Sequence, residues 1–187
     1  MASTSGGIRI LCAGGSVRPG NQTAKALAYV ADEIRPHKDI TVEIVDPAQL
    51  EMQLPGTEQD RSTMEALQAQ VTEAAGVVLA TPEYHGSYSS VINLFIEQLG
   101  YPSVLSGKPV ALLGVAASAI GAIKSLEHLR SVCSHVGAIV LPGPVSIANV
   151  HKGFDERGAC LDPAAANPCR GLRRRSCRFS GTQGRRA

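Results

Sequence analysis

A glycine-rich loop near the amino end of the chain, residues 14–23 (GGSVRPGNQT), has the composition of an anion-binding loop. It connects the apolar run 8–13 to a segment with helical periodicity, so it should end at a helix N-terminus. Backbone N–H groups are unpaired there, and the helix dipole favours negative charge. Small residues, hydroxyl groups and one arginine complete what a phosphate group needs. The alternative is a plain strand-to-helix turn in which Asn21 is the N-cap.

The familiar nucleotide motifs do not fit this loop. A G-x-G-x-x-G dinucleotide motif cannot be placed in it. The spacing from Gly15 to Gly20 is similar to that of a Walker motif, but Asn21 and Gln22 stand where Lys and Ser or Thr are required. The loop therefore disfavours ATP or GTP with magnesium.

A second loop, residues 81–90 (TPEYHGSYSS), follows the apolar run 76–80 and is suited to a flat ligand. Proline fixes the backbone, glycine permits close approach, and Tyr84 with His85 offers a planar edge. A third loop, 114–121 (GVAASAIG), is nearly free of large side chains, so its backbone amides can approach a ligand. Taken alone, Tyr84 is equally consistent with a core or interface aromatic, and His85 with a solvated loop residue.

Strands and helices alternate along the chain. The apolar runs lack the polar alternation of a half-exposed strand, which indicates strands that are buried on both faces. The segments between them carry apolar residues at helical spacing. The expected strands are 8–13, 41–45, 76–80, 110–115 and 138–141, and the expected helices are 22–34, 62–75, 91–99 and 123–133. This order predicts a doubly wound parallel α/β sandwich that binds ligands at the carboxyl ends of its strands.

The 187-residue chain has the length of one domain, and its charge is unevenly divided. Residues 1–156 are acidic on balance, whereas residues 157–187 carry eight arginines and one acidic residue, Asp162. The second segment has no apolar stripe at any period, so we assign the domain to 1–156 and the rest to an atypical basic tail, irregular or disordered. A disordered tail for nucleic acid or an acidic partner is one interpretation. The favoured one is a segment out of register with an ancestral reading frame, and nucleic acid is not an expected partner.

The cysteine pattern and the hydropathy exclude several classes of protein. Five cysteines, an odd number without a C-x-x-C pair, argue against a disulfide framework and a zinc site, and no metal is expected. No apolar run reaches the roughly 18 residues that span a bilayer. Residues 1–7 lack the basic and apolar regions of a signal peptide. We therefore expect a cytoplasmic protein without membrane contact.

Three sequence blocks together resemble the NAD(P)H-dependent FMN reductase family of flavodoxin-like proteins. They are residues 15–18 (GSVR), 81–87 (TPEYHGS) and 108–110 (KPV), and the similarity spans about residues 8–149. The resemblance implies a flavodoxin-like three-layer sandwich with a five-stranded parallel sheet in the order 2-1-3-4-5. It also implies FMN at the strand ends, NADPH or NADH as co-substrate, and a homodimer or homotetramer whose subunits help to frame the flavin.

The resemblance further assigns the residues that bind the cofactor. Those expected to hold the FMN phosphate are Ser16, Arg18, Asn21, Gln22 and Thr23; those expected along the isoalloxazine ring are Pro82, Glu83, Tyr84, His85, Gly86 and Ser87, with Ala117 and Ser118 in the third loop. Family members often have Ser at position 21, Asn at position 85 and Gly-Gly-Arg-like residues at 117–119. No catalytic side chain is expected, because hydride passes from nicotinamide to flavin N5 and the protein positions and polarises the rings. Free flavin, quinones or other small molecules then accept the electrons.

Two other functions fit part of the sequence. Cys12 and Arg18 have a C-x5-R spacing that resembles the phosphate loop of low-molecular-weight protein tyrosine phosphatases, in which Cys12 is the nucleophile. Against this function, Pro19 stands where Ser or Thr is expected, no Asp-Pro-Tyr segment is present, and the block 81–87 is left unexplained. A non-enzymatic flavodoxin-like carrier is the second alternative. The reductase is the favoured function.

Overall fold

The computed structural model describes residues 7–57, 61–163, 165–167 and 169, and within these ranges six strands form one parallel sheet. The strands are β1 Ile8–Gly14, β2 Ile40–Val45, β3 Gly76–Pro82, β4 Pro109–Val115, β5 Ile139–Val140 and β6 Val145–Ile147. They run in the order β2-β1-β3-β4-β5, and β6 also pairs with β4. The order 2-1-3-4-5 expected for a flavodoxin-like sandwich is confirmed.

The strands at the centre of the sheet consist of apolar residues that are buried on both faces. All residues of β3 (GVVLATP) and β4 (PVALLGV) are buried, as expected from runs without polar alternation. The register pairs Gly14 of β1 with Ala80 of β3, and Pro82 of β3 with Val115 of β4. The carboxyl ends of the three strands therefore reach the same edge of the sheet, and the loops that follow them start side by side.

The edge strand beside β4 is divided into two pieces. The sequence predicts one strand over 138–141, whereas the structure has β5 next to the start of β4 and β6 next to its end. Leu141 still donates its N–H to the carbonyl of Val110 at 2.8 Å. Pro142 and Pro144 follow, and neither has an N–H to donate, so the ladder is interrupted until β6 begins.

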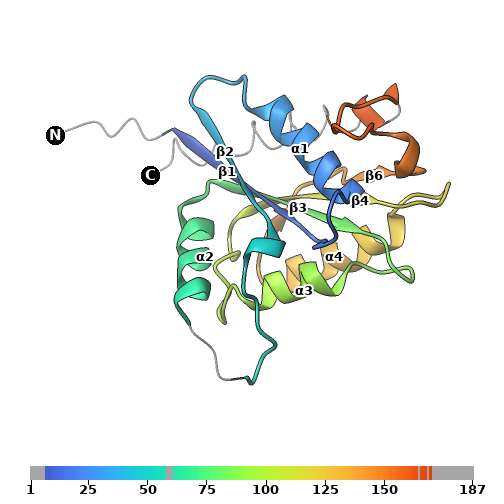
Figure 1. Cartoon of the computed structure of the whole chain (residues 1–187). Helices are drawn as coiled ribbons and strands as arrows, with labels where there is room; N and C mark the ends of the chain where they lie inside the picture. Colours follow the sequence, from blue (N-terminus) through green and yellow to red (C-terminus); the bar gives the residue numbers. More distant parts are fainter. Residues whose placement is uncertain (1–6, 58–60, 164, 168, 170–187) are drawn as a thin grey trace.

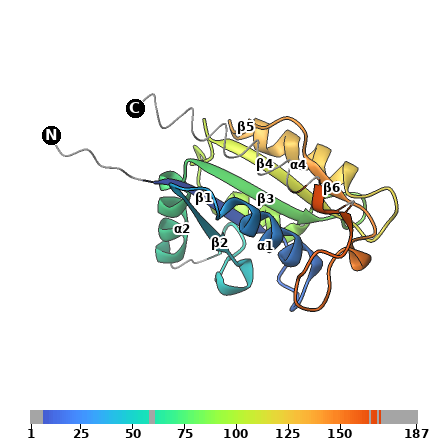
Figure 2. The same ribbon diagram turned by 90° about the horizontal axis from the view of Figure 1, so that it is seen from above.

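Helices cover both faces of the sheet, as Figure 1 and Figure 2 show. They are α1 Gln22–Ile34, α2 Arg61–Glu73, α3 Ser90–Glu97 and α4 Ile123–His135, with short 3-10 turns η1 Pro47–Gln49 and η2 Val150–Lys152. The buried side chains of α1 belong to one core cluster, and those of α2, α3 and α4 belong to a second cluster on the other face. None of the helices in the described ranges has the length and hydropathy needed to cross a membrane.

The chain after η2 lies beside α1, where Figure 1 draws it in red. The Tyr29 and Phe154 rings are 6.2 Å apart, and Lys25 Nζ donates to the carbonyl of Asp155 at 2.8 Å. Residues 163, 165–167 and 169 are helical, which the composition of the tail did not predict, and Ala165 and Cys169 are buried in the same cluster as α1. Residues 170–187, which make up most of the expected tail, lie outside the described residues, and the domain boundary at 156 stays a prediction.

Candidate functional site

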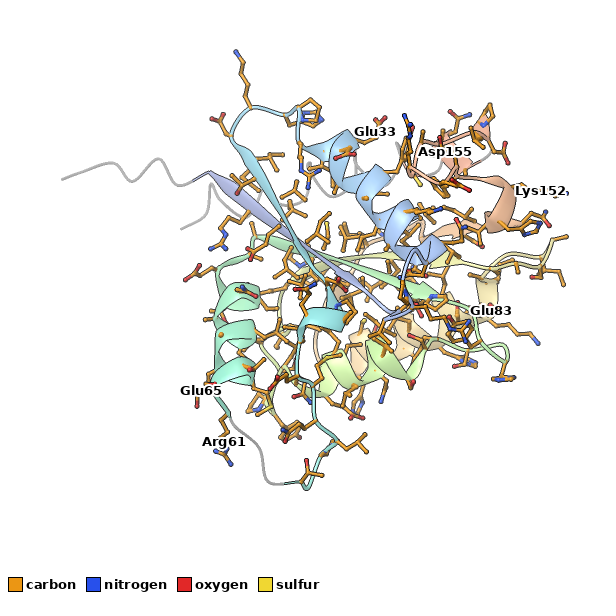
Figure 3. All side chains as sticks on the ribbon, in the orientation of Figure 1. Glu33, Arg61, Glu65, Glu83, Lys152 and Asp155 are labelled. Carbon is orange, nitrogen blue, oxygen red and sulfur yellow. The ribbon has the colours of Figure 1, made fainter. Side chains whose placement is uncertain are left out.

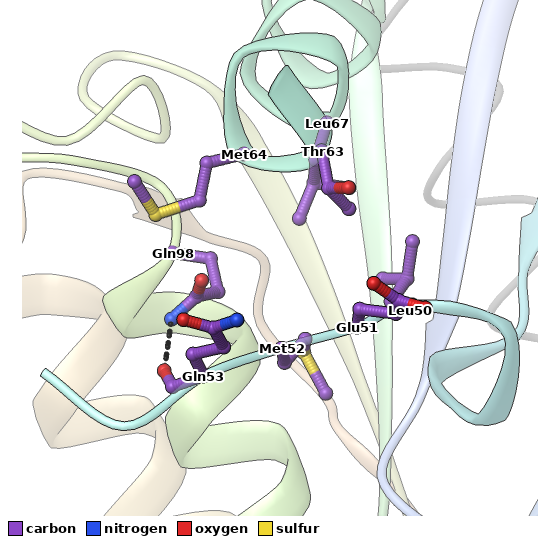
Figure 4. A pocket seen from close by; sticks show the side chains of 8 residues that line it. All are labelled: Leu50, Glu51, Met52, Gln53, Thr63, Met64, Leu67 and Gln98. Carbon is purple, nitrogen blue, oxygen red and sulfur yellow. Dashed lines mark hydrogen bonds between the residues drawn. The ribbon is translucent and has the colours of Figure 1, made fainter. Parts of the chain in front are cut away.

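The three loops identified from the sequence converge on one open cavity of about 430 Å³ at the carboxyl ends of the strands. This volume is in the usual range for a small-molecule site. The residues that line it are Arg18, Pro19, Gly20, Asn21, Gln22, Thr23, Pro82, Glu83, Tyr84, Val115, Ala116, Ala117 and Val150. A different pocket, shown in Figure 4 between the segment 50–53, α2 and the end of α3, measures only about 10 Å³, which is room for about one water molecule.

Asn21 shapes the first loop through both ends of its amide. Its Oδ1 accepts from the N–H of Ala24 at 2.8 Å, so Asn21 is the N-cap of α1. Its Nδ2 donates to the carbonyl of Arg18 at 2.7 Å. The N–H groups of Gln22 and Thr23, the first two positions of the helix, have no acceptor within α1. The N-cap interpretation is therefore right for the side chain of Asn21, and the helix N-terminus stays available to an anion.

The start of the same loop is packed tightly against β3 and α3. Ser89 Oγ donates to the carbonyl of Gly15 at 2.6 Å and accepts from the N–H of Ile92 at 3.2 Å, so it caps α3 as well. A Cβ on Gly15 would lie 2.9 Å from the carbonyl oxygen of Ala80, which leaves no room for a side chain. Ser16 is buried next to it, and its hydroxyl accepts from the N–H of Arg18 at 3.4 Å.

Two side chains on the cavity wall have properties that matter for a ligand. The guanidinium carbon of Arg18 lies 5.2 Å from the centroid of the Tyr84 ring, so a cation–π contact joins the first loop to the second. The Oε1 atom of Gln22 is buried and has no hydrogen-bond partner within the part of the chain that the structure describes. A buried carbonyl oxygen without a donor is unfavourable unless a ligand supplies one.

The second loop contains a tight two-residue turn. Tyr84 and Ser87 exchange two backbone hydrogen bonds of 2.9 and 3.0 Å. Between them, His85 and Gly86 have φ values of 52° and 72°, the left-handed pair of a type I′ turn. The turn holds Tyr84 at the cavity, whereas His85 is exposed and does not line the cavity.

The side chains that flank this turn are bonded to α4. Glu83, which Figure 3 labels at the loop end of the molecule, accepts from the N–H of Ser125 at Oε2 over 3.1 Å. Ser87 Oγ lies 3.0 Å from His128 Nδ1. Both residues were expected along the isoalloxazine ring; Glu83 lines the cavity although its Oε2 is bonded to α4, and the Ser87 hydroxyl is in contact with α4. His128 was not predicted from the sequence, because no local pattern shows which loop a helix contacts.

The third loop forms a cavity wall with small side chains next to η2. The N–H of Ala116 donates to Ile147 at 2.9 Å, and the N–H of Val150 donates to Ala116 at 3.0 Å. Of the two residues expected here, Ala117 lines the cavity and Ser118 does not. Ser16, Gly86 and Ser87 are likewise near the cavity but are not among its lining residues.

Cys12 is not placed to act as a phosphatase nucleophile. It lies within β1, in register with Ile44 and Val78, and is fully buried in the core. Burial raises the pKa of its thiol to about 12, against a smaller opposing effect of Arg35. A neutral, buried thiol cannot be the thiolate that phosphoryl transfer requires. Cys12 is thus a small core residue.

The fold and the cavity define a class of protein. The cavity lies at the ends of β1 and β3, the point where the winding of the sheet reverses, and flavodoxin-like proteins bind FMN at this switch point. The chain belongs to the NADPH-dependent FMN reductase family, whose family model matches residues 8–152. It is therefore a flavin-dependent NAD(P)H oxidoreductase by family, as the sequence blocks predicted, and neither the phosphatase nor the carrier is favoured.

Individual relatives agree with this assignment. The chain is 30% identical over 159 residues to an NADPH azoreductase of Bacillus sp. (strain OY1-2), with 83% of this chain and 85% of the relative covered. It is 29% identical over 124 residues to a 2-hydroxy-1,4-benzoquinone reductase of Burkholderia sp, with 64% and 67% covered. Among solved structures, the flavoenzyme NAD(P)H:(acceptor) oxidoreductase FerB from Paracoccus denitrificans has the same fold, with a TM-score of 0.77, 20% identity, and 94% of this chain and 98% of that chain covered.

Proposed function

We propose that this protein binds FMN in the cavity between its three loops and uses it to pass electrons from NAD(P)H to small aromatic acceptors. One observation carries the proposal. The cavity is lined by the N-terminus of α1, by the exposed Arg18 with the exposed Tyr84 ring in contact with it, and by the side-chain-poor third loop. Donors for an anion next to a flat wall with few side chains suit a ligand that has a dianionic tail and a flat ring.

The residues at the α1 end fit the phosphate of FMN. The N–H groups of Gln22 and Thr23 and the guanidinium of Arg18 are donors, and an anion beside them also gains from the helix dipole. Asn21 acts indirectly, because its amide is used to shape the loop. Ser16 also acts indirectly, because its hydroxyl accepts from the backbone N–H of Arg18 and so helps to shape the loop.

Other lining residues of the cavity fit the rest of FMN. The buried Oε1 of Gln22, which has no hydrogen-bond partner among the described residues, suits a hydroxyl donor of the ribityl chain, because an amide oxygen would repel the phosphate. Tyr84, Pro82 and the backbone of Ala116 and Ala117 form the wall for the ring. When bound, FMN supplies the hydride chemistry. The side chains of this chain bind and orient the cofactor and transfer no proton.

The acceptor and the assembly are also proposed. The azo and quinone relatives point to flat, conjugated acceptors for this chain, since such molecules can stack on an open flavin face. An apolar groove of about 450 Å³ includes Val17 and Leu54, which are 48% and 68% exposed, and Val17 also belongs to the first loop. We propose that a second copy of the chain covers this groove beside the flavin. A Leu54→Asp variant that keeps the mass of the wild-type assembly in light scattering would contradict this.

We further propose a cytoplasmic location. The co-substrate NAD(P)H is an intracellular metabolite, and Cys12, Cys133, Cys160 and Cys169 are free thiols, which suit a reducing compartment. Cell fractionation with an antibody to the chain tests this, and recovery in a secreted fraction would contradict it.

An FMN titration with riboflavin as the comparison ligand tests the proposed function. Arg18→Ala should weaken FMN binding by roughly tenfold or more and leave riboflavin binding nearly unchanged, because only FMN carries the phosphate. Gln22→Leu should weaken both ligands by a similar factor, because both carry the ribityl chain. Flavin fluorescence gives the affinities, and NADPH oxidation that depends on added FMN reports activity. A wild-type chain that binds no FMN would overturn the proposal.

A further inference from the structure

Two side-chain hydrogen bonds anchor the Tyr84 turn on one face of α4. On the amino side of Tyr84, Glu83 Oε2 accepts from the N–H of Ser125 at 3.1 Å. On the carboxyl side, Ser87 Oγ and His128 Nδ1 are 3.0 Å apart. Ser125 and His128 are three residues apart on the helix, so they lie on the same face.

A third contact continues this face. The side chain of Lys124 lies next to Gly86, at 3.5 Å from the position that a Cβ would take. Lys124 and His128 are four residues apart and are again neighbours on α4. The first half of α4 is therefore packed along the whole turn, although no residue of α4 lines the cavity itself.

The turn depends on an anchor because its own sequence only partly favours its backbone. A type I′ turn requires positive φ at both central positions, which favours Asn-Gly. Here Gly86 fits the second position, and His85 occupies the first at φ 52°, a conformation that is uncommon for non-glycine residues although His adopts it more often than most. A two-residue hairpin is also marginally stable in isolation. Contacts outside the turn therefore have to fix the position of Tyr84.

We propose that His128 is a positioning residue for the flavin: through Ser87 it holds the turn that presents Tyr84 to the isoalloxazine ring. Glu83 holds the turn on the other side of Tyr84. The same hydrogen bond from Ser125 caps the N-terminus of α4, where Ala122 has no side chain that could do so. The inference rests on the proposed function, since it assumes that FMN occupies the cavity. It assigns a role to a residue outside the cavity lining.

A double-mutant cycle on FMN affinity tests the proposal. His128→Leu and Ser87→Ala should each raise the Kd for FMN about five- to tenfold, and the double variant should be no weaker than the weaker single variant, because both remove the same hydrogen bond. His128→Asn should recover most of the affinity, since its amide places a polar atom close to the position of Nδ1. His135→Leu, at the exposed end of the same helix, is the matched control and should bind FMN as the wild type does.

Further readouts separate positioning from loss of structure. The visible absorption spectrum of bound FMN should change in His128→Leu, and kcat at saturating FMN should fall, while the thermal unfolding midpoint of the apoprotein stays close to that of the wild type. Additive effects of the two substitutions, or an unchanged Kd, would overturn the role of His128. Failure of the wild type to bind FMN would instead overturn the proposed function, so the two failures are distinguishable.

Discussion

Gly15 is a residue of the first loop where a single methyl group should be harmful. A Cβ there would lie 2.8 Å from Ser89 Oγ, 2.9 Å from the Ala80 carbonyl oxygen and 3.1 Å from Ile92 Cβ. One of these neighbours is a backbone oxygen, so relaxation is restricted. We expect Gly15→Ala to lower the free energy of unfolding by about 1–3 kcal/mol, as for other overpacked sites, and to weaken FMN binding because the first loop must shift.

Gly14→Ala is the control for this substitution. A Cβ on Gly14 would meet Leu27 at 3.8 Å and Pro47 at 4.0 Å, which are ordinary van der Waals contacts. Urea unfolding of both variants measures the difference. Equal destabilisation at the two positions would show that the tight contact at Gly15 is not the cause.

Residue types predicted where the site is, but not which way each side chain points. The positions of the three loops follow from strand ends that meet at one edge of a parallel sheet, and this can be deduced from the sequence. The directions of Glu83 and Ser87 depend on α4, about forty residues further along the chain, so no local pattern contains them. The same long-range dependence explains why Val150 and His128 were missed.

At the scale of elements, Lys108 links the end of α2 to the start of β4. Its Nζ donates to the carbonyls of Thr72 and Ala74, both at 2.8 Å, where the last carbonyls of the helix have no N–H donors within the helix. The helix dipole also favours a cation there. We expect Lys108→Met to lower the free energy of unfolding by about 1–2 kcal/mol. Chemical unfolding measures this, and Lys38→Met, at an exposed position in the turn after α1, should change stability much less.

A Lys108→Met variant as stable as Lys38→Met would show that the two carbonyls are equally well satisfied by water. Amide exchange in the last turn of α2 provides a local check. It should accelerate in Lys108→Met and not in the control, because the end of the helix loses its cap.

The elements themselves were predictable wherever a segment is long and strongly patterned. Strands β1, β3 and β4 and helices α1 and α4 lie where the apolar periodicity placed them, within one or two residues. The division of the edge strand into β5 and β6 could not be predicted. Pro142 and Pro144 break the ladder, while the pairing partner β4 continues past them. Pairing with a continuous neighbour restarts a strand in a way that its own sequence does not show.

At the scale of the whole molecule, the sheet separates two cores, and each contains buried thiols. Cys12 and Cys169 lie in the cluster beneath α1, and Cys133 lies in the cluster on the opposite face. Burial raises the pKa of each of these thiols to about 12 from an ordinary value of 9.0. Both cores therefore depend on thiols that stay protonated.

These pKa values predict how stability changes in alkali. Above pH 9 the unfolded chain loses the thiol proton, whereas the folded chain keeps it until about pH 12, so the unfolded state binds fewer protons in this window. Stability from each thiol is fully present below pH 9 and decreases by about 1.4 kcal/mol per pH unit as the pH rises toward 12. Between pH 8.5 and 10.5 the free energy of unfolding of the wild type should fall by about 2 kcal/mol more than that of Cys12→Ala. The slope acts over about 1.5 pH units of this range, namely those above pH 9. Urea unfolding with a reductant present measures both.

The comparison depends on the slope and not on absolute stability, since Cys12→Ala also leaves a small cavity. Val78→Ala separates the two effects, because Val78 is the neighbour of Cys12 in the sheet register and is equally buried but has no proton to lose. Its stability should be lower than that of the wild type at every pH, with an unchanged slope. If Cys12→Ala and Val78→Ala lose stability in parallel above pH 9, ionisation of the thiol is not the cause, and the alkaline limit of the fold must come from other groups.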